Sequence, residues 1–192
     1  MSRFAIGLLL WWLVGSGALA AGEPVLVVDR EPAQLPWWER ARWQPASTSV
    51  RGVPIKRLHP EWCAAEALSR EAIGEALLGV GAGDPLAGGL AFAIDGSFDG
   101  SGRPQTAFVG AYRRCAGEQG LFAAIVEPHP QRPRMRFLVE VPNSPSAFAA
   151  LGRDPDGTLV VWWCAACDHG VRIEFNRESK AFFVGGPAQR PR

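Results

Sequence analysis

Through residues 90–186, apolar and polar side chains alternate with a period of two in short runs. Such alternation is typical of strands that pack one face on a core. The linkers between the runs are short and rich in Gly, Pro, Asn and Asp, which favours an antiparallel meander. The runs are 90–96, 105–114, 120–127, 134–141, 157–164, 171–177 and 180–186. We therefore predict an antiparallel β-meander of about six strands over residues 90–185, with the nearly all-apolar run 157–164 at its centre.

The segment before these runs carries a helical pattern. Pro60 suits the first position of a helix, and the apolar residues after it, as far as Leu77, fall near helical spacing. Ser69 is a good N-cap for a second helical turn. We predict one or two short helices within residues 58–79, packed on the sheet, so the expected fold class is α+β and β-rich. Upstream aromatics are expected to cover the core: Trp37, Trp38 and Trp43.

The first twenty residues, MSRFAIGLLLWWLVGSGALA, are typical of a secretory signal peptide. Arg3 provides the positive start, and residues 4–14 form an apolar stretch too short to span a bilayer. Ala18-Leu19-Ala20 matches the small-x-small cleavage motif. We therefore expect cleavage after residue 20, a periplasmic or secreted location in a bacterium, and no stable membrane insertion afterwards.

The charge balance of the expected mature chain bears on its partners. Loss of Arg3 with the signal would leave 19 basic against 19 acidic residues, a formal charge of zero. Nucleic acids and anionic membrane surfaces both require a basic excess, so the charge argues against either as partner. We expect a single globular domain over residues 21–186 and a disordered tail over residues 187–192.

Four cysteines, Cys63, Cys115, Cys164 and Cys167, are candidates for chemistry. In an exported chain we expect them to form disulfides. Of the three possible connectivities, the preferred one joins Cys164 to Cys167 across a hairpin turn and Cys63 to Cys115 between the helical segment and the sheet. Two alternatives stay open. In the first, the WCAAC motif superficially resembles that of thioredoxin-like oxidoreductases, and Cys164 and Cys167 would be the redox pair. In the second, Cys164 and Cys167 are half of a metal site, and His59, Cys63 and Cys115 could supply the rest.

Residues 94–112, IDGSFDGSGRPQTAFVGAY, resemble one copy of an FG-GAP or VCBS repeat. In such repeats oxygen ligands at alternate loop positions hold a calcium ion, and a strand follows. The resemblance places these ligands at Ser97, Asp99, Ser101 and Gln105. Calcium sites use several ionised oxygens, and Asp99 is the only carboxylate in this set, so the copy is degenerate and calcium binding is left open. Without a second copy, the resemblance implies a loop-and-strand unit and not a propeller.

We find no catalytic constellation in the sequence. The sequence around Ser97, GSFDG, is not the G-x-S-x-G nucleophile elbow. Asp168 cannot orient its neighbour His169 for catalysis, because adjacent strand residues point apart. His129 lies in the Pro-rich segment EPHPQRP, where we expect a solvated loop residue. We therefore predict an exported, non-enzymatic module, without cofactor, that binds a protein or an envelope component.

Overall fold

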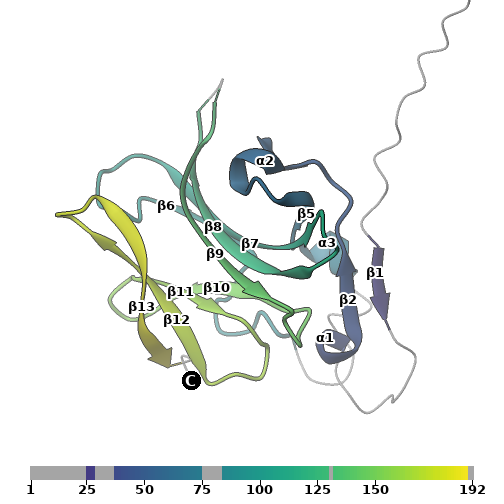
Figure 1. The fold of residues 1–192 in the computed structure, drawn as a ribbon. Helices are drawn as coiled ribbons and strands as arrows, with labels where there is room; N and C mark the ends of the chain where they lie inside the picture. The colour runs from purple at the N-terminus through teal and green to yellow at the C-terminus, as the bar shows by residue number, and fades with distance from the viewer. Residues whose placement is uncertain (1–24, 29–36, 75–83, 130–131, 190–192) are drawn as a thin grey trace, which may run out of the picture.

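The structure, a computed structural model, describes residues 25–28, 37–74, 84–129 and 132–189 (Figure 1). Strands dominate these residues, and each helix among them is a single turn of four residues. The strands are β1 (Val25–Val28), β2 (Ala41–Gln44), β3 (Ser49–Val50), β4 (Val53–Pro54), β5 (Trp62–Ala67), β6 (Ala93–Gly96), β7 (Gln105–Arg114), β8 (Gln119–Glu127), β9 (Arg134–Pro142), β10 (Ala150–Arg153), β11 (Leu159–Trp162), β12 (His169–Asn176) and β13 (Ala181–Gln189). The helices are α1 (Trp37–Arg40), α2 (Ile55–Leu58) and α3 (Arg70–Ile73). The predicted β-rich fold with antiparallel sheets is confirmed.

The larger sheet has five strands. Its strands β7, β8 and β9 form a meander, in which Ala123 of β8 lies opposite Val109 of β7 and Val139 of β9. β6 pairs with residues 105–108 of β7, and β5 pairs with residues 110–114 of the same strand. β9 is therefore the terminal strand on one side of the sheet, while β5 and β6 share the other side.

The second sheet is a four-stranded antiparallel meander of β10, β11, β12 and β13, with β13 as a terminal strand. A bridge between Ala91 and Leu151 links its first strand to the chain that enters β6. Buried side chains of both sheets form one shared core, which includes Ala107, Val109, Leu121, Ile125, Leu151, Val161 and Ile173. The two sheets thus pack as the layers of a sandwich (Figure 1).

The N-terminal elements cover the opposite face of the five-stranded sheet. Val50, Val53, Ile55 and Leu58, from β3, β4 and α2, are buried in a second apolar cluster. Their partners on the sheet are large side chains that include Phe108, Tyr112 and Phe122. The strands β7 and β8 are therefore buried on both faces, which explains why Ala107–Tyr112 and Leu121–Val126 are buried without a break. As expected, Trp38 and Trp43 are buried, both in the main core.

The helices predicted within residues 58–79 are largely wrong. Trp62–Ala67 form β5, and only α3 falls in the predicted range, with Ser69 Oγ accepting its capping hydrogen bond from Ala72 N at 3.1 Å. Alanine favours helices by well under about 1 kcal/mol per residue over most alternatives. Pairing with β7 and complete burial of Trp62 outweigh that preference.

Two other predictions need correction. The strands after residue 90 do not form one meander, because they divide between the two sheets. Residues 187–189 are not a disordered tail; they continue β13, and Ala188 is buried. The predicted signal peptide over residues 1–20 and the last residues, 190–192, lie outside the described part of the chain. No helix of the described residues has the length and hydropathy needed to cross a membrane.

Candidate functional site

The hairpin that joins β11 to β12 contains the predicted Cys164–Cys167 disulfide, with the two Cα atoms 5.4 Å apart. The chain passes from Cys167 through Asp168 directly into β12, and no helix begins there. Thioredoxin-like enzymes depend on a helix N-terminus that lowers the pKa of the first cysteine. This pair lacks that feature, and its geometry is that of a bridge across a turn. Asp168 and His169 are both exposed.

The calcium-like loop brings its predicted residues together, but they bond to the loop itself. Ser101 N donates to Asp99 Oδ1 at 3.0 Å, and Gly102 N donates to Ser97 Oγ at 2.9 Å. Gln105 Oε1 accepts from the backbone N of Phe98 at 2.8 Å. These bonds close the turn and use oxygens that a calcium ion would need.

Guanidinium groups lie beside the one carboxylate of this loop. Arg136 and Arg103 come within 3.5 and 4.0 Å of Asp99 Oδ2, and both also contact Glu127. The Asp99 side chain is only 2% exposed. Burial by itself would raise the pKa of Asp99, but hydrogen bonds from Ser101 and the charge of Arg136 lower it below its usual value. The positive charge that calcium would supply comes here from arginine.

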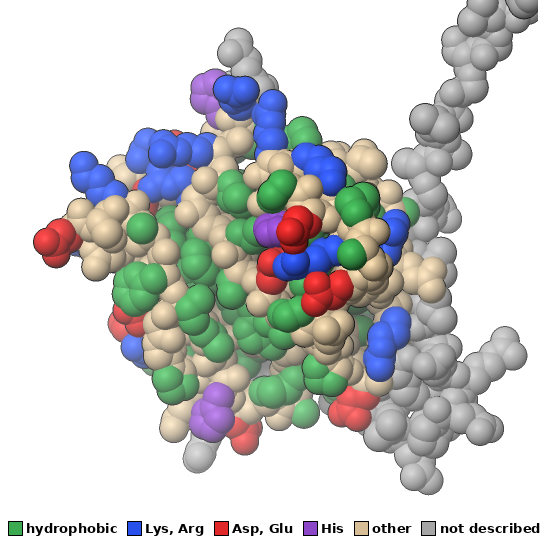
Figure 2. Space-filling view, in the orientation of Figure 1, with side chains coloured by type: hydrophobic (Ala, Val, Ile, Leu, Met, Phe, Trp, Pro, Cys, Tyr) green, Lys and Arg blue, Asp and Glu red, His purple; other side chains and the backbone are tan. Residues whose placement is uncertain are grey.

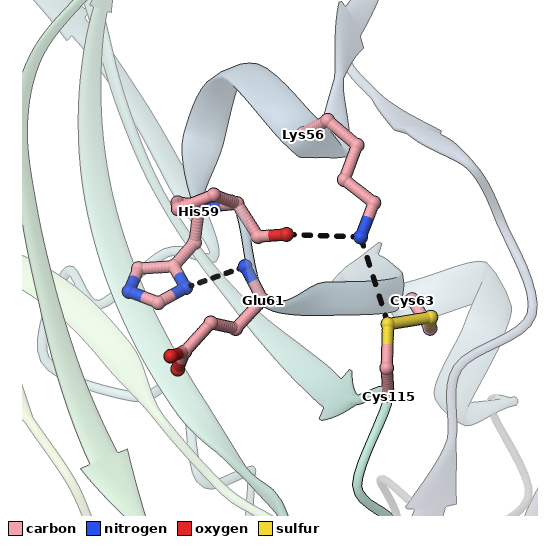
Figure 3. Close-up of a disulfide and its surroundings, with 6 residues drawn as sticks. Lys56, His59, Glu61, Cys63 and Cys115 are labelled. Atoms are coloured by element: carbon pink, nitrogen blue, oxygen red, sulfur yellow. Dashed lines mark hydrogen bonds between the residues drawn. A yellow bond between two sulfur atoms is a disulfide. The ribbon is translucent and has the colours of Figure 1, made fainter.

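The second predicted disulfide, Cys63–Cys115, joins β5 to the turn after β7, with the two Cα atoms 4.9 Å apart. Both cysteines are exposed. The Lys56 ammonium lies 3.5 Å from Cys115 Sγ and donates to the Pro60 carbonyl oxygen at 2.9 Å (Figure 3). This lysine was missed from the sequence because nothing in the spacing relates it to a cysteine 59 residues away.

Two residues that adjoin this disulfide in the sequence, Trp62 and Arg114, belong to a network of charged and aromatic groups. Glu140 accepts hydrogen bonds from Trp62 Nε1 at 2.7 Å and from Arg114 at 3.0 Å. The Trp62 ring stacks between those of Tyr112, at 4.7 Å, and His59, at 5.6 Å. Trp62 and Tyr112 are completely buried, so the network serves chiefly to fix β5 and α2 on the sheet.

Apolar side chains of the core are incompletely covered where β9 and β13, the terminal strands of the two sheets, meet. Phe137 and Val139 of β9 and Phe182 of β13 pack against the core but stay partly exposed, and Val184 of β13 is 50% exposed. Ile173, the register partner of Val184, is only 4% exposed. Figure 2 shows hydrophobic side chains gathered over β9, β12 and β13. We call the set Phe137, Val139, Phe182 and Val184 the open side.

The cysteines of the predicted metal site are not available as thiolate ligands. All four cysteines are in disulfides, and a metal-binding cysteine must be a thiolate. Within the described ranges, no three His, Cys, Asp or Glu residues gather closely enough to hold a metal ion.

Comparisons with protein-family models, with curated proteins and with solved structures found no match for this chain. The resemblance of residues 94–112 to an FG-GAP or VCBS repeat therefore stays a prediction. Any function must be argued from the described surfaces and side chains.

Proposed function

We propose that this chain is an exported, non-enzymatic binding module, and that its open side receives an extended apolar segment of a partner protein. The observation that carries the proposal is the exposure of Val184. Its register partner, Ile173, is a core residue, and a solvent-exposed apolar position on the same face of the same sheet is what an incomplete core leaves behind.

The burial of neighbouring residues supports this interpretation. Ile125 and Ala123, on the face of β8 that packs in the main core, are 0% and 1% exposed. Their register partners one strand further out, Phe137 and Val139, are only partly buried. Burial thus decreases toward the edge of the sheet, although the side chains remain large and apolar.

The backbone of the terminal strands also suits an extended partner. In the part of the chain that the structure describes, no strand pairs with the outer edge of β9 or of β13. Unpaired strand edges recruit extended peptides through main-chain hydrogen bonds, while apolar side chains of the peptide fill adjacent sites. The rings of Phe137 and Phe182 pack on each other, with centroids 6.3 Å apart, so the apolar surface is continuous from β9 to β13 and both strands can contact one such segment.

Export is part of the same proposal. It is supported by the signal-like residues 1–20, which lie outside the described part of the chain, and by two disulfides, which persist in oxidising compartments.

Site-specific photo-crosslinking in the native host tests the proposal. A photoreactive amino acid at Val184 should give an adduct with a partner protein, whereas the same group at Gln44, exposed on β2, should not. The partner identified in this way is then purified and titrated. Val184→Glu should weaken its binding at least about tenfold, because a charge replaces buried apolar surface, and Gln44→Glu should leave binding unchanged.

Three outcomes would overturn the proposal. They are equal crosslinking from both positions, unchanged binding by Val184→Glu, and an adduct of twice the chain mass. The last would show that the open side receives a second copy of this chain.

A further inference from the structure

The Cys63–Cys115 disulfide is more accessible to solvent than the Cys164–Cys167 disulfide. Both Cys63 and Cys115 are exposed, whereas Cys164 and Cys167 are partly buried. Cys63 lies where the register between β5 and β7 shifts, between Trp62 and Ala64. Thiol–disulfide exchange requires that a thiolate reach one sulfur along the S–S axis, so access is the first determinant of its rate.

A fixed positive charge adds a second determinant. The Lys56 ammonium lies 3.5 Å from Cys115 Sγ, and its hydrogen bond to the Pro60 carbonyl holds it there (Figure 3). A neighbouring lysine favours the thiolate over the thiol. A thiolate that is stabilised in this way is also the better leaving group.

From these two observations we infer that Cys63–Cys115 is a thiol–disulfide exchange site that is attacked at Cys63, an activity beyond the proposed binding function. An incoming thiolate forms a bond with Cys63 Sγ, the Cys63–Cys115 bond breaks, and its electron pair leaves on Cys115 Sγ beside the Lys56 ammonium. With a dithiol, its second thiolate attacks the dithiol's own sulfur in the mixed disulfide, the bond to Cys63 Sγ breaks, and the Cys63 and Cys115 thiolates take up the protons that the dithiol released. The dithiol ends as a disulfide, and both cysteines end reduced.

The fold around the bond can tolerate its opening. β5 pairs with β7 from Ala64 to Ala67, and Trp62 is buried in the second apolar cluster, through contacts that do not involve the cysteine sulfurs. The exchange site also lies at the β5 side of the five-stranded sheet, whereas the open side lies at β9. Cleavage therefore frees a reactive pair without dismantling the sheet.

The test is the rate of reduction of each disulfide in the purified full-length protein. Dithiothreitol is added at fixed neutral pH and low ionic strength, samples are quenched with acid and alkylated, and peptide mass spectrometry reports each cysteine. Cys63 and Cys115 should be reduced before Cys164 and Cys167. Lys56→Gln should slow reduction of Cys63–Cys115 roughly threefold, the effect of one exposed charge at this distance on a leaving thiolate.

Matched variants separate the local contact from net charge. Lys56→Arg should keep most of the rate, and Arg57→Gln, which removes one charge from the next exposed residue of α2, should leave it nearly unchanged. With glutathione as a monothiol, the adduct should appear on Cys63. Earlier reduction of Cys164–Cys167, equal effects of Lys56→Gln and Arg57→Gln, or an adduct chiefly on Cys115 would each overturn the inference.

Discussion

Removal of each disulfide separately should reveal very different contributions to the free energy of unfolding. Cys63 and Cys115 are 52 residues apart in sequence, whereas Cys164 and Cys167 are three apart. If a bridge acts mainly by restricting the unfolded chain, loop-closure entropy assigns about 4 kcal/mol to the first and about 2 kcal/mol to the second at 25 °C. The two double alanine variants should therefore differ by about 2 kcal/mol.

Urea denaturation followed by tryptophan fluorescence measures the difference. With a slope of about 2 kcal/mol/M, loss of the Cys63–Cys115 bridge should lower the midpoint by about 2 M, and loss of the other bridge by about 1 M. Each variant controls for the other, because each replaces two cysteines with two alanines. This equilibrium contribution is separate from the exchange rate, which depends on access and on Lys56.

The result that would refute this reasoning is specific. If loss of the Cys164–Cys167 bridge lowers the free energy of unfolding as much as loss of the longer bridge, restriction of the unfolded chain is not the main contribution. The hairpin bridge would then act through native contacts around the turn between β11 and β12.

Two further predictions concern charged side chains. Glu140→Gln should lower the free energy of unfolding by about 1–2 kcal/mol in urea, because Arg114 loses a charged partner in a partly buried network that also holds Trp62; no loss would show that the network is not stabilising. The pKa of Asp99 is lowered in the folded state, so its stabilisation is present above the unfolded pKa of about 4 and is lost as pH falls through the lower folded pKa. Asp99→Asn should therefore flatten the acid limb of stability against pH in thermal unfolding, and an unchanged limb would contradict this assignment.

The sequence predicts this fold well where periodicity and burial agree. The runs at 105–114, 120–127 and 134–141 correspond closely to β7, β8 and β9. The first two, which are largely apolar, match strands buried on both faces, and the alternating third matches a partly exposed terminal strand. The two disulfide pairs match the pairing predicted from the expected export and from the position of the hairpin. The three strands and the hairpin bridge depend on local patterns, whereas the Cys63–Cys115 pairing is what remains once Cys164 and Cys167 are joined.

The predictions fail where an element takes its structure from distant residues. β5 is a strand because β7, some 45 residues later, offers a pairing edge, and an alanine-rich segment has only a weak preference to resist it. The division into two sheets depends on the buried connection Ser146–Ala149, which has neither alternation nor a turn signal. Lys56 and the open side were missed for the same reason, since each is defined by contact or exposure in three dimensions.

The two sites proposed for this chain lie at opposite sides of one sheet. The disulfide near Lys56 ties β5 to β7, and the open side begins at β9, with β7 and β8 between them. A direct link joins the two sites: Glu140, next to Val139 on β9, accepts hydrogen bonds from Trp62 and Arg114, which adjoin Cys63 and Cys115. These bonds do not involve the cysteines, and β7 and β8 pair along eight registers between β5 and β9. We therefore expect Phe137 and Val139 to keep their places when the disulfide opens. Loss of partner binding and loss of thiol exchange are therefore independent results, and failure of either proposal leaves the other standing.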